Sequence, residues 1–411
     1  MTVRETCLKA KEHASEIAFA GEDKMNMMLI AAASALRDEA DHIIAENKKD
    51  IEKCTRGPQF VDRLMLDKKR IDGIAAGLEK LVQLKCPVGE VLEERALYNG
   101  LQLRRVRVPL GVLGIIYEAR PNVTADAIGL AIKSGNAVVL RGSKDALLSN
   151  KAVTSVIKNA LKGSGFDPEF IQLIEDATHE GATEFMRMNG IVDVIIPRGS
   201  AALIQNAVKN ATVPIIETGT GNCHVYFENS ADIKKAIPIL INAKTQRTSV
   251  CNACESLLID EEFAGRHLKE IVSALKEKNV EIVACEKCRK ILPELEAATE
   301  EDFYTEFLDL KISVKIVNGV DEAIAHINKY GTHHSDSIVT ENAQAADKFL
   351  EMVDSAAVYV NASTRFTDGF EFGMGAEMGI STQKLHARGP MGLRELTSYK
   401  YRVRGDGQIR G

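Results

Sequence analysis

Short apolar runs alternate with longer amphipathic stretches along the chain from about residue 105. Residues 105–119 and 136–142 are rich in β-branched side chains, which favours strands. Residues 124–135 and 150–165 carry apolar positions at helical spacing and end at glycine, which is typical of helices. Further strands are expected at 170–176, 192–199 and 214–218. This alternation predicts a parallel sheet with helices on both faces.

The same alternation starts again near residue 223, with a strand pattern at 223–228 and a helical pattern at 231–246. The strands expected after these are 255–260, 280–285, 312–317 and 356–361, and the helices are 261–279 and 321–331. No internal repeat and no low-complexity linker interrupts the two series. We therefore predict an α/β fold with two doubly wound domains that join near residue 220.

Two segments do not follow the alternation. Residues 97–108 contain Asn99-Gly100 between two strand-like runs, which predicts a hairpin. The C-terminal residues 395–407 alternate like an edge strand. Exposed strands invite pairing with another chain, so the two segments are candidates for a subunit contact. The alternative is a hairpin that folds back on its own domain.

Composition narrows the class of protein. The 411 residues are 45% apolar and 27% charged, which is ordinary for a soluble chain with a large core. A net charge of −6, with both signs mixed along the chain, argues against nucleic acid and against a basic membrane patch. The charged N-terminus has no signal core, and the apolar run 27–36 is too short to span a bilayer. We expect a cytoplasmic chain with reduced cysteines.

The eight cysteines allow several interpretations. Cys251, Cys254, Cys285 and Cys288 form two C-x2-C pairs that are able to bind zinc, although the 30 residues between the pairs exceed the usual spacing. A redox pair is expected to open a helix after a strand. Residues 285–290 look instead like a charged surface turn. Buried, unreactive thiols are expected for Cys7, Cys54, Cys86 and Cys223.

Cys251 differs from the other cysteines through its neighbours. It sits in "RTSVCN", a loop that is expected before a strand, where nucleophiles are often placed. Glu217 ends a predicted strand, so its carboxylate would face the crevice where α/β sheets bind ligands. Asn122 follows another strand end and is suited to donating to an oxyanion. The alternatives are a cap or surface charge for Glu217 and a turn-forming side chain for Asn122.

The combination of these residues carries a resemblance. Asn122, Glu217 in "ETG" and Cys251, 34 residues after Glu217, resemble the aldehyde dehydrogenase superfamily. Within it, "YEARPNVTADA", "ETGTGNCHVYF", "QRTSVCNA", "HSDSIVT" and "GISTQKLHARGPMGLRELTSYKY" are similar to the γ-glutamyl phosphate reductase family over nearly the whole chain. The resemblance implies NADPH-dependent reduction of L-glutamyl 5-phosphate to L-glutamate 5-semialdehyde and phosphate, a step of proline synthesis.

The resemblance also implies the domain plan. Residues 1–95 and 109–220 would bind NADPH, and residues 221–390 would carry the nucleophilic cysteine. Residues 96–108 and 391–411 would form a small β oligomerisation flap. A homo-oligomer, dimer or tetramer, is expected, with transient contact to glutamate 5-kinase. No nucleic acid, membrane or metal partner is expected.

The resemblance assigns roles to individual residues. Cys251 would attack the acyl phosphate, Asn122 would hold the oxyanion, and Glu217 would carry the thiol proton. The expected cofactor contacts are Arg141, Ser143, Lys144, Gly199, Ser200 and Glu306. The expected substrate contacts are Arg120, His334, Ser335, Arg365 and Arg388. Structural ion pairs remain the alternative for the arginines, and a solvated turn for Lys144.

Two other functions stay open on the sequence. One is a hydrolytic or acylating aldehyde dehydrogenase that acts on a different substrate. The other is a non-catalytic scaffold that binds a nucleotide or zinc. No segment matches the dinucleotide fingerprint G-x-G-x-x-G strictly, because "GTGNCH" and "GMGAEMG" only approach it.

Overall fold

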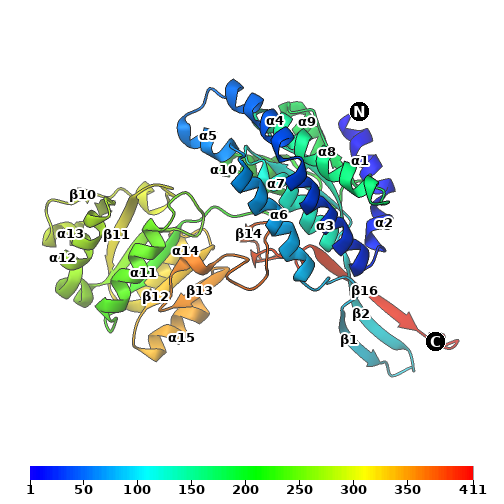
Figure 1. The fold of residues 1–411 in the computed structure, drawn as a ribbon. Helices are drawn as coiled ribbons and strands as arrows, with labels where there is room; N and C mark the ends of the chain where they lie inside the picture. Colours follow the sequence, from blue (N-terminus) through cyan, green and yellow to red (C-terminus); the bar gives the residue numbers. More distant parts are fainter. Residues whose placement is uncertain (411) are drawn as a thin grey trace. The chain divides into compact units, whose positions relative to one another are not determined.

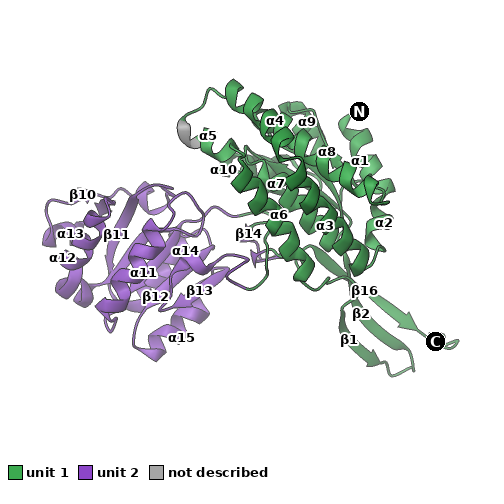
Figure 2. Cartoon of the chain, in the orientation of Figure 1, with its two compact units in different colours: residues 1–218, 373–379, 391–411 green, residues 219–372, 380–390 purple. Residues whose placement is uncertain are grey.

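The computed structural model describes residues 1–410, the side chains of residues 58 and 59 excepted. The chain forms two compact units (Figure 2). Unit 1 consists of residues 1–218, 373–379 and 391–411, and unit 2 of residues 219–372 and 380–390. The main division falls at residue 218, whereas the predicted junction is near residue 220. Residues 373–379 belong to unit 1, which differs from the predicted range 221–390 for the second domain.

Unit 1 is built on a parallel sheet with the strand order β5-β4-β3-β6. Its strands are β3 (Val112–Tyr117), β4 (Ala137–Arg141), β5 (Ile171–Leu173) and β6 (Val194–Arg198). Every residue of β3 and β4 is buried, as expected for strands with helices on both faces. The strand predicted at 214–218 is not formed: only a parallel bridge between Ile215 and Ile195 joins the segment that leads to Glu217 to this sheet.

Helices surround this sheet (Figure 1). Those that follow its strands are α7 (Asn122–Lys133), α8 (Leu147–Gly163), α9 (His179–Phe185) and α10 (Ala201–Asn210). The N-terminal helices are α1 (Val3–Glu12), α2 (Ala14–Ala18), α3 (Glu22–Asp38), α4 (Ala40–Lys53), α5 (Pro58–Leu64) and α6 (Lys68–Gln83). The apolar run 27–36 lies in α3, whose Leu29, Ala32 and Leu36 are buried. It is therefore a core helix of unit 1.

A second, antiparallel sheet of unit 1 has the order β1-β2-β16 (Figure 1). Its strands are β1 (Val91–Ala96), β2 (Gln102–Pro109) and β16 (Thr397–Arg404). The hairpin predicted from Asn99-Gly100 is confirmed, because β1 pairs with β2 and Gly100 has φ of 84°. Its first strand begins at Val91, before the predicted start of the flap at residue 96. The C-terminal strand completes the sheet within the same chain.

Unit 2 contains a parallel sheet with the order β10-β9-β11-β8-β7-β12-β13. Its strands are β7 (Cys223–Phe227), β8 (Cys254–Asp260), β9 (Glu281–Ala284), β10 (Glu296–Ala297), β11 (Lys311–Val317), β12 (Ser335–Val339) and β13 (Ala357–Val360). Its helices are α11 (Ile233–Thr245), α12 (Glu261–Glu277), α13 (Glu286–Ile291), α14 (Gly319–Tyr330) and α15 (Ala343–Met352). Strands β14 (Ile380–Ser381) and β15 (Gly389–Pro390) form a separate pair.

Alternate residues of the central strands of unit 2 enter two different cores. Leu257 and Ile259 pack in one core with Phe263 of α12. Leu258 packs in the other core with Phe349 of α15. Since successive side chains of a strand point to opposite faces, the sheet is covered on both sides, as predicted. No helix among residues 1–410 has both the length and the apolar character required to cross a membrane.

Candidate active site

Cys251 lies in the loop that joins α11 to β8 in unit 2. Side chains fix the backbone on both sides of it. The Asn252 amide donates to the Thr367 carbonyl at 2.9 Å, and the Thr364 hydroxyl donates to the Asn252 carbonyl at 2.7 Å. Cys251 itself is half-buried. The order of helix, loop and strand that was predicted around this thiol is confirmed.

The glycine at position 221 allows this loop to pack closely. A Cβ atom on Gly221 would lie 1.4 Å from the Cys251 carbonyl oxygen, so no larger residue fits without moving the loop. The Gly221 N–H donates to Glu306 Oε1 at 2.7 Å, and the Cys223 thiol donates to the Cys251 carbonyl at 3.1 Å. Burial raises the pKa of Cys223, which keeps this thiol neutral, and burial also raises the pKa of Glu306. Residues 221–223 therefore support the Cys251 loop.

Two arginines bring positive charge to the same loop. Arg365 is half-buried and donates through Nε to Gln246 Oε1 at 2.9 Å. Burial lowers the pKa of Arg365, Arg247 lowers it further, and Cys251 acts in the opposite direction. A guanidinium that interacts with a thiol favours its ionised, nucleophilic form. Arg365 was predicted from the sequence, whereas Arg247 was not, although it lies in the segment "QRTSVCNA".

A buried ion pair lies behind the start of β8. Lys244 and Glu255 are both 0% exposed and are hydrogen-bonded to each other. Burial raises the pKa of Glu255 to about 7, against the opposing effect of Lys244. Glu255 Oε1 also accepts the Leu308 N–H at 3.2 Å, which ties the segment after Glu306 to β8. This pair was not predicted from the sequence. Its two residues are 11 positions apart, in a helix and in a strand, and nothing in the sequence shows that these charged side chains are buried.

His334 and Ser335 hold the loops around Cys251. His334 Nδ1 lies 2.8 Å from Ser335 Oγ, which donates to Thr367 Oγ1 at 2.6 Å. The two residues are 1% and 0% exposed. Burial lowers the pKa of His334 to about 4, so its imidazole is neutral at pH 7. The structure places these two residues, which were predicted as pocket-lining, among the supports of the Thr367 turn.

Arg388 takes part in an ion pair within unit 2. Its Nη2 atom donates to Asp354 Oδ1 at 2.8 Å and to the Asp354 carbonyl at 2.9 Å. Lys384 lies 2.7 Å from the other carboxylate oxygen. Lys384 and Arg388 together lower the pKa of Asp354 to about 2. In this structure Arg388 therefore occupies the structural ion pair that the sequence left as its alternative.

In unit 1 the predicted residues gather at the carboxyl edge of the parallel sheet. They follow the ends of β3, β4 and β6 and of the segment bridged to β6: Arg120 and Asn122, Arg141 to Lys144, Gly199 and Ser200, and Glu217. Asn122 is the first residue of α7, and its amide donates to Asp126 Oδ2 at 3.1 Å. Burial raises the pKa of Asp126 to about 6. Asp126 was not predicted from the sequence, although it lies one helical turn after Asn122.

The turn after β4 combines buried and exposed polar groups. Arg141 is 9% exposed and donates through Nη2 to the Thr178 carbonyl at 2.7 Å. Its Nε atom and the Ser143 hydroxyl are buried and have no hydrogen-bond partner among the described residues. Lys144 is exposed. A ligand with several acceptor oxygens would satisfy these donors.

Ser200 caps the N-terminus of α10, and a carboxylate from the chain already lies there. Glu118 accepts from the Ser200 N–H at 3.0 Å and from the Ser200 hydroxyl at 2.6 Å. A Cβ atom on Gly199 would lie 2.7 Å from the Glu118 carboxyl carbon, which explains why glycine precedes the cap. The helix start therefore holds an internal anion at the place where the resemblance implies a pyrophosphate.

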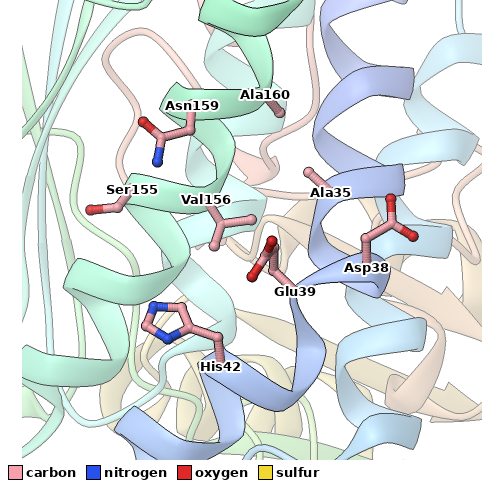
Figure 3. A pocket seen from close by; sticks show the side chains of 8 residues that line it. All are labelled: Ala35, Asp38, Glu39, His42, Ser155, Val156, Asn159 and Ala160. Atoms are coloured by element: carbon pink, nitrogen blue, oxygen red, sulfur yellow. The ribbon is translucent and has the colours of Figure 1, made fainter.

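Other clusters of unit 1 lie away from the predicted residues. A hollow of about 480 Å³ lies over α3, α4 and α8, where His42, Asp38 and Ser155 line it (Figure 3).

His13, Glu16 and Asp167 form the only group of three potential metal ligands found among the described residues. The four cysteines of the two C-x2-C pairs do not form such a group within residues 1–410.

Comparisons with known proteins agree with this architecture. The profile of the Aldehyde dehydrogenase family matches residues 2–287. A γ-glutamyl phosphate reductase of Clostridium botulinum (strain Eklund 17B / Type B) is 55% identical over 405 residues, which cover 98% of each chain. A protein of the same name from Caldanaerobacter subterraneus subsp. tengcongensis is 52% identical over 413 residues, which cover 100% of each chain.

Solved structures give the same result. The crystal structure of γ-glutamyl phosphate reductase from Thermotoga maritima is similar with a TM-score of 0.98 and 48% identity, and 100% of each chain is covered. An acetylating aldehyde dehydrogenase from Geobacillus thermoglucosidasius shares the fold with a TM-score of 0.73 at 18% identity, over 100% of this chain and 97% of that one. The chain belongs to the aldehyde dehydrogenase family.

Proposed function

We propose that the chain catalyses the NADPH-dependent reduction of L-glutamyl 5-phosphate to L-glutamate 5-semialdehyde, with release of phosphate, in proline biosynthesis. The observation that carries this proposal is the 52–55% identity to γ-glutamyl phosphate reductases over the whole chain. The fixed loop that presents Cys251 beside Arg365 supports it with the thiol chemistry that the reaction requires.

The first step is acyl transfer to the thiol. The Cys251 thiolate attacks the acyl carbon, the bond from carbon to the phosphate oxygen breaks, and inorganic phosphate leaves. The Asn122 amide and the Cys251 N–H donate to the oxyanion that develops, and each such donor contributes about 2.7–4 kcal/mol to lowering a barrier of this kind. The charge of Arg365, which interacts with Cys251, favours the ionised form of the thiol. We propose Arg120, Arg365 and Arg388 as the anion partners of the substrate. His334 and Ser335 are proposed to line the pocket.

The second step returns the thiol. NADPH, when bound, would supply the hydride needed to reduce the thioester on Cys251. The resulting thiohemiacetal alkoxide collapses: its carbon–oxygen double bond re-forms as the carbon–sulfur bond breaks, and Cys251 leaves as thiolate. Glu217 holds and returns the thiol proton. It does not activate water, because hydrolysis of the thioester would waste the activated substrate.

The residues at the carboxyl edge of unit 1 fit the cofactor that the family implies. The unpaired donors of Arg141 and Ser143 and the exposed cation of Lys144 suit the 2′-phosphate of NADPH. Gly199 and Ser200 would hold the pyrophosphate after displacement of the Glu118 carboxylate. Glu306 would hold the nicotinamide ribose, which requires it to release the Gly221 N–H.

Exposed side chains support a subunit contact on the β1-β2-β16 sheet. Tyr399, Tyr401 and Val403 are 51%, 54% and 49% exposed and alternate along β16, so they lie on one face. We propose that this face joins copies of the chain in a homo-oligomer. We also propose that the enzyme acts in the cytoplasm. Because the acyl phosphate is unstable, we propose that the enzyme receives it in transient contact with glutamate 5-kinase.

The reverse reaction tests the proposed function. Glutamate semialdehyde and NADP⁺ are mixed with the enzyme in buffers with and without inorganic phosphate, and NADPH absorbance is followed. NADPH formation is expected to require phosphate, because phosphate must accept the acyl group from Cys251. Formation that ignores phosphate would indicate a hydrolytic dehydrogenase, and no formation under either condition would favour a non-catalytic scaffold.

A further inference from the structure

The second C-x2-C pair, Cys285 and Cys288, takes no part in the chemistry proposed above. Its surroundings differ from the surface turn that the sequence predicted for residues 285–290. Strand β9 ends at Ala284, Cys285 is the residue before α13, and Cys288 lies in the first turn of that helix beside β11 (Figure 1). This is the strand-to-helix position that a redox pair is expected to occupy.

The two sulfur atoms are already close. Cys285 Sγ lies 3.6 Å from Cys288 Sγ, and both thiols are free. A disulfide needs about 2.05 Å between the sulfur atoms, so these two must approach by roughly 1.5 Å to form one. The backbone on either side is fixed, because the Cys285 N–H donates to the Val314 carbonyl at 2.9 Å and the Leu292 N–H donates to the Cys288 carbonyl at 2.9 Å.

The two thiols differ in access. Cys285 is half-buried and accepts the Ile316 N–H at 3.4 Å, whereas Cys288 is 0% exposed within the core of unit 2. The hydrogen bond between Cys285 and Cys288 lowers the pKa of Cys285 to about 5, with help from backbone N–H groups. The same interaction, together with burial, raises the pKa of Cys288. An accessible thiolate beside a buried thiol is the arrangement of an attacking and a resolving cysteine.

This pair is separate from Cys251. All strands of the sheet run parallel, and Cys251 precedes β8 while Cys285 follows β9. Ala284 of β9 and Leu257 of β8 both pair with Val314 of β11, so they lie at the same level of the sheet. Leu257 is three residues beyond Cys254, and β9 lies two strands away from β8. These steps amount to roughly 10 Å along the strands and roughly 10 Å across them. Cys285 is therefore out of reach of Cys251, and its natural partner is Cys288.

We propose that Cys285 and Cys288 form a reversible dithiol–disulfide pair that reacts with low-molecular-weight disulfides. The Cys285 thiolate attacks one sulfur of such a disulfide, the external S–S bond breaks, and one thiolate leaves. Cys288 then loses its proton to solvent and attacks Cys285 Sγ, which forms the internal disulfide and releases the second thiolate. The protein loses two electrons, and the external disulfide is reduced to two thiols.

Oxidised glutathione provides the test on the full-length protein. The protein is equilibrated in buffers of rising oxidised-to-reduced glutathione ratio, quenched with acid, alkylated and mapped by mass spectrometry. The peptide that contains both cysteines is expected to lose two hydrogens and to regain them with dithiothreitol. Cys251 and Cys254 have the same spacing and serve as the internal control, and they are expected not to form a disulfide with each other, since Cys254 is 0% exposed and lies within β8.

Two variants identify the attacking thiol. Cys288→Ala is expected to stop the reaction at a stable glutathione adduct on Cys285, and Cys285→Ser is expected to leave Cys288 unmodified. If Cys288→Ala does not fold, the rate of alkylation of the natural chain is measured instead. Cys285 is then expected to react with iodoacetamide at least about tenfold faster at pH 7 than the half-buried Cys54. The proposal is overturned if both cysteines stay reduced at every glutathione ratio. It is also overturned if glutathione adds to Cys288 before Cys285.

Discussion

At the scale of single residues, the proposed mechanism makes Cys251 and Glu217 unequal. Cys251→Ser removes the nucleophile and is expected to lower the rate of thioester formation by roughly 10³-fold or more. Glu217→Gln removes only a proton carrier and is expected to lower it by about 10²-fold or less. Phosphate release in a single turnover measures both rates. Equal losses in the two variants would contradict the role given to Glu217.

The sequence identified some of these residues and not others, for physical reasons. Cys251 was recognisable because a loop of small polar residues separates a helix pattern from a strand pattern. The partners of Arg388 and His334 could not be predicted, because the ion pair with Asp354 and the hydrogen bond to Ser335 arise only from tertiary contacts or side-chain orientation. Asp126 and Glu118 were missed, because they lie inside the predicted helix 124–135 and the predicted strand 105–119, where one carboxylate gives no signal of its own.

At the scale of elements, the turn at Gly221 controls the loop that carries the nucleophile. Gly221→Ala would place a methyl group against the Cys251 carbonyl, so the loop must shift. A shift of about 1 Å at a reacting group is expected to lower kcat/KM by about 10²-fold. Steady-state kinetics in the direction of semialdehyde oxidation measures this loss.

A matched glycine provides the control for that prediction. Gly73 lies inside α6, and nothing lies within 4 Å of the Cβ atom that an alanine would add there. Gly73→Ala is expected to leave kcat/KM unchanged and to stabilise the fold by about 0.5–1 kcal/mol. If both variants lose activity alike, close packing at Gly221 is not the cause.

The elements themselves were largely predictable, while their assignment to units was not. β-Branched runs predicted most strands of the two parallel sheets, but β10 and β12 were not among the expected strands. Asn99-Gly100 predicted the hairpin between β1 and β2. Residues 373–379 return to unit 1 through contacts such as that of Gly375, at φ of 72°, with the Leu84 side chain. Such a segment has no period of its own, so only its packing reveals which unit it joins.

At the scale of the whole molecule, the β1-β2-β16 sheet is expected to determine the assembly. Tyr401→Asp would place a charge in the exposed row on β16 and is expected to lower the mass of the particle in light scattering, while the thermal unfolding of unit 1 changes little. Val208 on α10 is 46% exposed, so Val208→Asp is the control and is expected to leave the mass unchanged. A natural chain that is monomeric at high concentration would refute the contact.

The carboxylate of Glu118 has a consequence for selectivity. Under the proposed function, Glu118 competes with the cofactor's pyrophosphate for the N-terminus of α10. Because Glu118 belongs to the same chain, its effective concentration at that helix end is high. A free phosphate ion has only its charge with which to displace this competitor, whereas a dinucleotide adds the contacts of its bases and sugars. Glu118 thereby keeps inorganic phosphate, a product of the reaction, from occupying the cofactor-binding site.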